Sequence, residues 1–396
     1  MNAPMLTLVG RLRRWAQERG AHRAVILLAD GEAESAALTF AELDARARSI
    51  AAQLAALGAR QKPVLLLCPS EIDFVASFVG CLYAGAIAVP APTQLRSNLA
   101  ARIAMVAQDA VPAVIIAADA SRPVLKALAL RQPVLWLDEA ESSAPFIPDV
   151  SPNETAFIQY SSGSTASPKG IAITHGNLIA NLEMFCAGFG VHNGSCFVNW
   201  LPLFHDMGLV GHCLAALYQG VACVMVPPLM FRQRPERWVE AMARYGGTIS
   251  GAPNFAFELC ARRAARLEGT PLDLHRWETA FCGAEMIRAP TMERFATALA
   301  PFGFRAAALT PAYGLAEATL FVASRPKGQG VATQRRERAG QVRQIVSCGQ
   351  TASAETIRIV DPAAALPLPD GEEGEIWVKG PHIAAGSWRR ASETAA

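Results

Sequence analysis

The sequence predicts an α/β fold in which helices cover both faces of mostly parallel sheets. Helix and strand signals alternate along residues 39–321. The predicted strands, such as residues 64–68 and 113–117, are continuous hydrophobic runs, which is the pattern of strands buried on both faces. The 396 residues are 52% hydrophobic and 18% charged. This composition excludes disordered, collagen-like and coiled-coil proteins and suits two or three domains or one large multi-layered unit.

Individual elements follow from local signals. Thr39 and Glu42 have the spacing of a capping box, so we expect a helix to begin there and to end before Gly58. Pro69 ends the strand at residues 64–68, and Ser70 is placed to cap the next helix. Further along we expect a helix over residues 254–268, a strand over 279–282 and a helix over 289–300.

Two long uncharged stretches, residues 74–92 and 208–231, have the length of a membrane span. Each is broken internally, the first at Gly85 and the second at Gly220, and each then continues as a short strand-like run that ends in prolines. We therefore interpret each stretch as a buried helix, a tight turn and a buried strand, and we expect no membrane span.

Charge and cysteine content limit the partners and the compartment. The 36 basic and 34 acidic residues leave a net charge of +2, which favours neither a nucleic acid nor an anionic membrane. The nine cysteines include no C-x-x-C pair, which argues against a disulfide framework or a zinc site. Residues 1–14 lack the apolar core of a secretory signal. We expect a cytoplasmic protein.

The pattern of charged and apolar residues changes after residue 324. Residues 325–343 contain six basic residues, one acidic residue and no apolar periodicity, so we interpret them as a loop or insertion. Residues 356–360 and 375–378 alternate apolar and polar side chains, which is typical of half-buried antiparallel strands, and Asp370-Gly371 between them is a turn signal.

The strongest chemical signal lies at residues 160–170, YSSGSTASPKG. Its hydroxyls, glycines and Lys169 suit the anionic oxygens of a phosphate. The alternative is an ordinary surface loop rich in serine and glycine. It is not a Walker A loop, because Pro168 rather than glycine precedes the lysine, and it contains no G-x-S-x-G.

This loop resembles the phosphate-binding signature of the adenylate-forming acyl ligases, with Ala166 where that family usually has glycine. Four further segments are similar to the family's motifs and occur in the family's order: NWLPLFHDMG at 199–208, GAPNF at 251–255, GAE at 283–285 and TPAYGLAEAT at 310–319. Ala316 replaces the usual threonine of the last motif. The amino-acid sequence of these segments, together with VSCG at 346–349 and the basic segment, is most similar to the fatty-acyl-AMP ligase branch of the family.

The resemblance implies a fold of two interlocked, helix-flanked, mostly parallel sheets with a small β-barrel subdomain. It divides the chain into an α/β core of two pseudo-repeated subdomains at 1–324, a basic insertion at 325–345 and the start of the barrel at 346–396. The family's ribose-clamping Asp and mobile C-terminal domain have no counterpart here. We therefore expect a truncated large domain in which adenylation by the chain alone is slow or absent.

The resemblance also implies the activity. A fatty acid reacts with ATP and Mg²⁺ to give an acyl-adenylate and pyrophosphate, and the acyl group passes to the phosphopantetheine of an acyl carrier protein, as in lipid, polyketide and lipopeptide biosynthesis. Two alternatives stay open: a long-chain acyl-CoA synthetase, which would form acyl-CoA, and a non-catalytic nucleotide- or acyl-binding module, which would not exchange pyrophosphate.

The matched positions define the candidate site, with His205, Lys169 and Glu317 as the catalytic residues and Glu317 as the Mg²⁺ ligand. Lys169 has a solvated loop lysine as its alternative, His205 a core histidine oriented by Asp206, and Glu317 a surface carboxylate; Tyr313 beside Gly314 is expected to stack on adenine. The other expected contacts are phosphate at Ser161, Ser162, Gly163, Ser164 and Thr165; adenine and AMP at Gly283, Ala284, Glu285, Ala312, Tyr313, Gly314, Leu315 and Ala316; and an acyl tunnel at Trp200, Phe204, His205, Gly251, Asn254 and Phe255.

Overall fold

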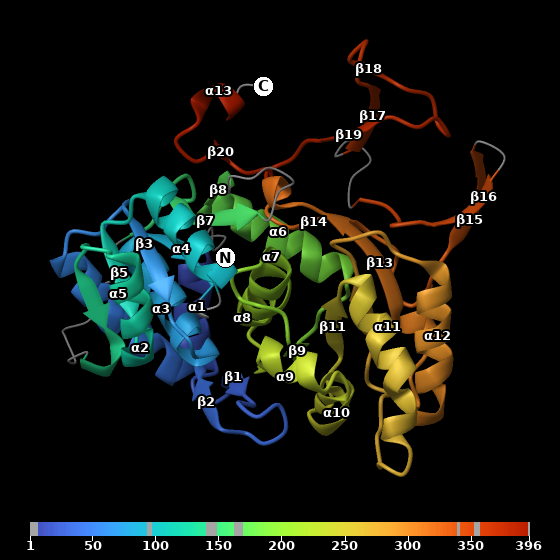
Figure 1. The fold of residues 1–396 in the computed structure, drawn as a ribbon, viewed down its shortest axis with the longest axis horizontal. Coiled ribbons are helices and arrows are strands. Elements are labelled where there is room, and N and C mark those ends of the chain that lie inside the picture. Colours follow the sequence, from blue (N-terminus) through green and yellow to red (C-terminus); the bar gives the residue numbers. More distant parts are fainter. Residues whose placement is uncertain are drawn as a thin grey trace.

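Two sheets with helices on their faces form the body of the protein (Figure 1). The structure is a computed structural model and describes residues 7–92, 97–139, 149–161, 169–338, 341–351 and 357–394. The N-terminal half of the chain, blue to green in Figure 1, builds most of one sheet, and the following residues, green to orange, build most of the other.

The first sheet has seven strands in the order β20-β8-β7-β4-β3-β5-β6, of which β7, β4, β3, β5 and β6 run parallel. In β3, Val64 and Leu66 pack into one hydrophobic core while Leu65 and Leu67 pack into another, and all four are fully buried. The prediction of doubly covered strands is confirmed. The strands are β3 (Pro63–Leu67), β4 (Ile87–Pro90), β5 (Val114–Ala117), β6 (Val134–Trp136), β7 (Thr155–Ser161), β8 (Lys169–Thr174) and β20 (Gly386–Ser387).

The second sheet has eight strands in the order β14-β13-β12-β11-β9-β10-β1-β2. Its six inner strands are parallel, and the edge strands β14 and β2 are antiparallel to their neighbours. The strands are β1 (Arg23–Leu27), β2 (Ala36–Thr39), β9 (Phe197–Asn199), β10 (Cys223–Met225), β11 (Ile249–Ala252), β12 (Thr279–Cys282), β13 (Leu309–Gly314) and β14 (Phe321–Ser324).

The helices begin largely where local signals place them. The Thr39–Glu42 capping box is present, with the Glu42 backbone N–H donating to Thr39 Oγ1 at 3.2 Å. Ser70 occupies its N-cap position but makes no capping hydrogen bond; Glu71 and Asp73 supply the negative charge that the first turn favours. The α-helices are α1 (Leu8–Glu18), α2 (Phe40–Ala56), α3 (Glu71–Ala84), α4 (Ser97–Ala110), α5 (Arg122–Leu128), α6 (His175–Gly188), α7 (Asp206–Gly208), α8 (Ala215–Gln219), α9 (Pro228–Gln233), α10 (Glu236–Arg244), α11 (Asn254–Arg263), α12 (Ala289–Leu299) and α13 (Ala391–Thr394).

Both uncharged stretches fold as predicted. The first is α3, a left-handed Gly85 with φ 62° and β4. The second contains a π-helix, η3 (Leu209–Leu214), then α8, a left-handed Gly220 with φ 76° and β10. Across the part of the chain that the structure describes, no helix is long and apolar enough to cross a membrane.

The basic segment, interpreted above as a loop or insertion, has regular secondary structure in part. It contains an antiparallel hairpin of β15 (Thr333–Arg338) and β16 (Gln341–Val346). Thr333 to Arg335 of β15 are exposed, as are Gln344 and Ile345 of β16. Because the backbone ladder needs no buried face, a hairpin of this kind leaves no apolar periodicity in the sequence.

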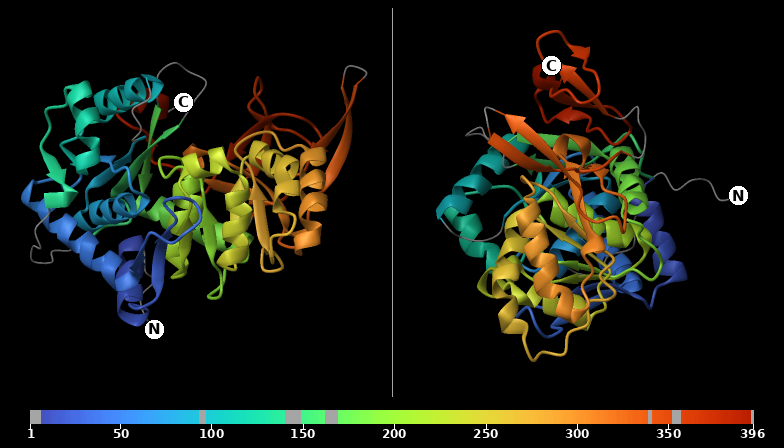
Figure 2. Two further views of the ribbon diagram at one scale, coloured as in Figure 1. Left: turned by 60° about the horizontal axis from the view of Figure 1, so that its bottom comes forward. Right: turned by 90° about the vertical axis from the view of Figure 1, so that its right-hand side faces the viewer.

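The predicted strands at 356–360 and 375–378 are confirmed as β17 (Ile357–Asp361) and β19 (Glu375–Val378), which pair antiparallel. With β18 (Leu366–Pro367) they form a small sheet that stands away from the body (Figure 2). In the described ranges no closed barrel is formed.

Residues 380–388 leave this small sheet and return to the body. Strand β20 pairs with β8, and the Trp388 backbone N–H donates to the Gly170 carbonyl at 2.8 Å. The Ala384 N–H donates to the Glu317 carbonyl, also at 2.8 Å. The described residues 386–387 thus add an edge strand to the seven-stranded sheet.

Candidate functional site

The carboxyl ends of the neighbouring strands β12 and β13 lie at one cavity of about 380 Å³, which we call the first cavity. In open α/β sheets this edge is where ligands bind. Strand β13 ends here at Gly314, and the residues after β12 line the same space. The predicted site residues that line it are Phe204, His205, Gly283, Ala284, Ala312, Tyr313, Gly314, Ala316 and Glu317.

Two backbone features shape this wall. A Cβ on Gly314 would lie 1.9 Å from the Leu320 carbonyl oxygen, so only glycine permits this close approach of β13 and β14. Ala284 adopts a left-handed φ of 65°, which is uncommon for alanine and is a form of strain often found at functional sites. Both residues line the same cavity as the half-buried Tyr313.

Tyr313 and Glu317 interact electrostatically across this wall. Burial and then the nearby charge of Glu317 raise the pKa of Tyr313, so its ring stays neutral. Glu317 lies in the 3₁₀ turn η7 (Ala316–Ala318) and is exposed to the cavity. Its carboxylate makes no hydrogen bond or ion pair with any residue that the structure describes.

His205 and Asp206 form the rim between β9 and η3. His205 Nδ1 lies 2.7 Å from Asp206 Oδ1. Burial lowers the pKa of His205, but the hydrogen bond and the charge of Asp206 outweigh burial, so the pKa is raised above its ordinary 6.5. The geometry supports the interpretation that Asp206 orients the ring and favours its protonated form.

The opposite wall contains Arg102 and Gln159, which the sequence analysis did not identify, and Tyr160, the first residue of the predicted phosphate loop. Arg102 on α4 is half-buried and makes no ion pair with the residues described here. Gln159 Nε2 donates to the Phe204 carbonyl at 2.8 Å, and the Tyr160 hydroxyl donates to Asp109 Oδ2 at 2.7 Å. The seven-residue spacing of Arg102 and Asp109, on one face of a helix, is the sequence signal that could have indicated this wall.

The predicted phosphate loop is only partly described. Ser162, Gly163, Ser164 and Thr165 lie outside the described residues, as do the other residues of 162–168. The loop's two ends are fixed, because Ser161 on β7 pairs with Lys169 on β8. Lys169 is half-buried at the start of β8 and does not line the first cavity, whereas the preceding Gln159 and Tyr160 do.

A second cavity of about 500 Å³ adjoins the first, and His205 and Met207 line both. Trp200 and Phe255, two predicted tunnel residues, line this second cavity. The Trp200 ring stacks on Phe231, with centroids 3.6 Å apart and planes 14° apart. The other lining residues are Leu201, Pro202, Pro228, Arg232, Pro253 and Leu259, so the cavity is largely apolar.

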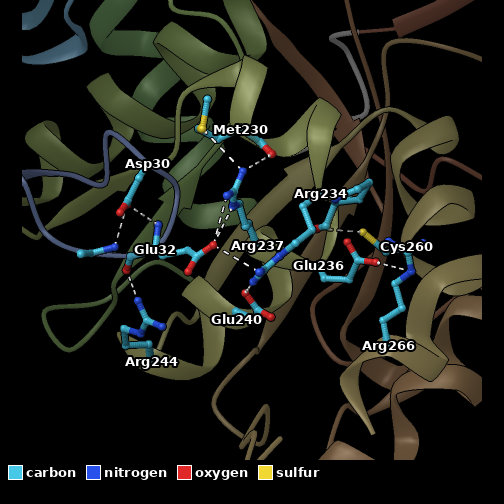
Figure 3. Close-up of polar contacts among 12 residues, drawn as sticks. Asp30, Glu32, Met230, Arg234, Glu236, Arg237, Glu240, Arg244, Cys260 and Arg266 are labelled. Atoms are coloured by element: carbon cyan, nitrogen blue, oxygen red, sulfur yellow. Dashed lines mark hydrogen bonds and ion pairs between the residues drawn. The ribbon is translucent and has the colours of Figure 1, made fainter.

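An ion-pair network outside the second cavity holds one of its walls, helix α9 (Figure 3). Glu32, in the loop between β1 and β2, accepts hydrogen bonds from Arg237 at 3.1 and 3.2 Å and lies 3.2 Å from Arg234. Arg234 also pairs with Glu240, and Arg237 Nη1 reaches the Met230 carbonyl at the back of α9. These contacts fix α9 against α10 and the β1–β2 loop.

Four predicted residues lie near the cavities without lining them. Gly251 is buried in β11, where an added Cβ would lie 2.4 Å from the Phe281 ring. Asn254 Oδ1 accepts from the Arg288 N–H at 2.9 Å, and Glu285 Oε1 accepts from the Phe255 N–H at 2.7 Å. Asn254 and Glu285 therefore join the start of α11 to the segment between β12 and α12. Leu315 packs beneath the η7 turn.

Residues 12–388 match the family model described as AMP-binding enzyme. The chain belongs to this family. It is 36% identical to the medium-chain-fatty-acid–[acyl-carrier-protein] ligase JamA of Moorena producens, covering 98% of this chain and 70% of JamA. It is also 36% identical to the long-chain-fatty-acid–AMP ligase FadD23 of Mycobacterium tuberculosis, covering 92% and 67%.

Among solved structures, the fatty acyl-adenylate ligase from L. pneumophila, in complex with acyl adenylate and pyrophosphate, superposes with a TM-score of 0.92 at 34% identity. The match covers 99% of this chain and 71% of that one. The fold of two mostly parallel sheets is therefore that of the adenylate-forming enzymes. In this AMP-binding enzyme, the residues adjoining the first cavity belong to the matched region, and no group of three metal-ligating side chains occurs among the residues described.

Proposed function

We propose that this AMP-binding enzyme activates a fatty acid with ATP to an acyl-adenylate, releases pyrophosphate, and passes the acyl group to the phosphopantetheine of an acyl carrier protein. The observation that carries the proposal is the junction at His205 and Met207. There the first cavity, with Tyr313 and Glu317, adjoins the apolar second cavity. A nucleotide in one and a hydrocarbon chain in the other would bring a carboxylate and an α-phosphate together at this rim.

The residues supply binding and positioning rather than acid–base chemistry. The fatty acid carboxylate attacks the α-phosphorus, and pyrophosphate leaves. Tyr313 stacks on adenine, and Lys169 with the 161–169 loop contacts phosphate oxygens. Protonated His205 and the guanidinium of Arg102 place positive charge where two anions must approach. Holding both reactants in one orientation and offsetting charge are effective means of lowering such a barrier.

The free carboxylate of Glu317 fits a magnesium ion. Mg²⁺ in nucleotide sites is held by one or two carboxylates together with phosphate oxygens and water, so a single unpaired Glu facing the cavity is a sufficient protein ligand. When bound, the ion neutralises phosphate charge. Asp206 is already engaged with His205 and the Met207 N–H, which leaves Glu317 as the available carboxylate on the described cavity wall.

A single-turnover assay tests the proposal even where turnover is slow. The protein, in excess over ATP, is mixed with Mg²⁺ and fatty acids of increasing length, and acyl-adenylate and pyrophosphate are quantified by mass spectrometry. We expect both products in equal amounts. Absence of acyl-adenylate for every chain length, with ATP bound, would refute the proposal and leave a nucleotide-binding module.

Adding an acyl acceptor distinguishes a fatty-acyl-AMP ligase, which uses a carrier protein, from an acyl-CoA synthetase, which uses free CoA. We expect the acyl-adenylate to be consumed by a carrier protein bearing phosphopantetheine and to persist with free CoA. Formation of acyl-CoA at a comparable rate would instead identify an acyl-CoA synthetase.

A further inference from the structure

We propose that Asn181 is a positioning residue that holds the Glu317 turn in its metal-binding arrangement. Asn181 lies on α6, the helix that follows β8 and the predicted phosphate loop. Its side chain is completely buried, yet it lies in neither of the two cavities described above. The inference rests on the proposed function only in taking Glu317 as the metal ligand.

The side-chain amide of Asn181 hydrogen-bonds to the backbone on both sides of one turn, an arrangement that we call a clasp. Its Nδ2 donates to the Ala318 carbonyl at 3.0 Å and to the Phe321 carbonyl at 2.8 Å, and its Oδ1 accepts from the Phe321 N–H at 3.1 Å. Both amide hydrogens and the oxygen are therefore used. Since these backbone groups are buried, no water replaces the amide if it is removed.

The turn that Asn181 holds is strained. Thr319 has φ 66° and ψ −51°, and the Leu320 N–H bonds back to the Ala318 carbonyl at 2.8 Å. This is the geometry of a classic γ-turn, which is rare and costly for a β-branched residue. Such a conformation persists only where the surroundings determine it. Here the surroundings include a hydrogen bond from the Thr319 hydroxyl to the His382 carbonyl at 2.7 Å, and Thr319 is fully buried.

The clasp acts on the residue next to the turn. Glu317 immediately precedes Ala318, and its own carbonyl accepts from the Ala384 N–H at 2.8 Å. The turn is thus held from α6 by Asn181, and from residues 380–388 by the His382 carbonyl and the Ala384 N–H. Because a strained turn would relax if one clasp were lost, the Glu317 carboxylate would move away from its position in the cavity wall.

Asn199 provides a matched control on the other side of the site. It is also buried, its Nδ2 donates to the Leu201 and Gly208 carbonyls at 3.3 and 3.4 Å, and its Oδ1 accepts from the Leu201 N–H at 2.9 Å. This clasp holds the His205 loop rather than the Glu317 turn. Asn→Asp at either position keeps the size and the acceptor and removes the donors.

The test uses two binding measurements on the whole chain, neither of which needs turnover. Affinity for Mn²⁺ in the presence of ATP is measured by electron paramagnetic resonance, and affinity for a fluorescent fatty acid is measured by titration. We expect Asn181→Asp to weaken Mn²⁺–ATP binding about tenfold, on the scale of one or two hydrogen bonds, and to leave fatty acid binding unchanged. Asn199→Asp is expected to weaken fatty acid binding, because the His205 loop that it holds lines the second cavity.

Thr319 gives a second, independent pair. Thr319→Ser keeps the hydroxyl and should retain Mn²⁺–ATP binding, whereas Thr319→Val removes it and should lose affinity as Asn181→Asp does. This pair also carries the test if Asn181→Asp does not fold.

Two results would overturn the inference. The first is wild-type affinity for Mn²⁺–ATP in Asn181→Asp or in Thr319→Val. The second is an equal loss of affinity for both ligands in Asn181→Asp and Asn199→Asp, which would indicate that the substitutions disturb the whole fold rather than one site. A wild-type chain that binds no Mn²⁺–ATP would remove the Glu317 site and the inference together. Wild-type binding without acyl-adenylate formation would count against the proposed function alone.

Discussion

His205 Nδ1 and Asp206 Oδ1 lie 2.7 Å apart at the rim shared by the two cavities. Two adjacent residues are thus arranged so that a carboxylate faces one ring nitrogen and leaves the other free for a ligand. Arg102, across the first cavity, opposes the resulting positive charge. The charge state of this rim follows from the balance of the three groups.

That balance predicts opposite shifts for two substitutions. Asp206→Asn should lower the pKa of His205, because burial and Arg102 then act unopposed, and Arg102→Gln should raise it further. The His205 Hε1 resonance, followed by NMR against pH, measures both. Shifts of the same sign would contradict the arrangement.

The same pair makes stability depend on pH. The folded pKa of His205 is raised above 6.5, so its contribution is fully present below that ordinary value and is lost as pH rises through the folded pKa. The difference in melting temperature between the wild type and Asp206→Asn should therefore shrink on going from pH 5.5 to pH 8.5, both values being about a unit or two from 6.5.

Tyr313→Ala should weaken AMP binding by ~1–3 kcal/mol, the range for loss of one base–aromatic stack. Calorimetry with AMP measures it. Tyr313→Phe, which retains the ring, is the control and should bind AMP nearly as tightly as the wild type. Equal affinity in all three proteins would remove Tyr313 from the adenine site.

Glu317→Gln should abolish Mg²⁺-dependent pyrophosphate exchange while leaving the melting temperature unchanged, because the side chain is exposed to the cavity and supports no described contact. AMP binding without metal serves as the control for an intact adenine site. Near-normal exchange would mean that another group holds the metal.

Gly251→Ala should destabilise the protein by ~1–3 kcal/mol, because the new methyl group overlaps the Phe281 ring at 2.4 Å. Phe281 lines the first cavity, so the displaced ring should also reduce ligand binding there. Thermal unfolding of the single variants and of Gly251→Ala/Phe281→Leu gives the coupling. If the double variant regains no stability, the contact with Phe281 is not the cause.

Replacing residues 334–345 by a short glycine linker should leave the melting temperature nearly unchanged, because the described side chains of this hairpin are mostly exposed. Val346 must be kept, since it is buried in the main core. If the hairpin acts as the insertion of the fatty-acyl-AMP ligases does, it prevents transfer of the acyl group to CoA. Its removal should then permit some acyl-CoA formation. No acyl-CoA after removal would leave the hairpin without that role.

Local interactions determined what the sequence alone could predict. The Thr39–Glu42 capping box, the doubly buried strand β3 and the glycine turns at Gly85 and Gly220 depend on residues within about four positions of one another. Tyr313 and Glu317 lie close together for the same reason, because one short segment brings both to the end of β13, whereas their roles were expected from the family resemblance.

Only the tertiary structure decided how distant segments meet. Asn181 clasps residues 318–321 from more than 130 positions away, and Ala384 reaches Glu317 from the C-terminal segment. Arg102, which the sequence analysis did not identify, lies in the wall of the first cavity, and Gly251, expected in the acyl tunnel, packs beneath the Phe281 ring. A buried hydrogen bond or a steric overlap between such segments depends on the packing of whole sheets and helices. Neither leaves a periodic pattern in the residues that form it.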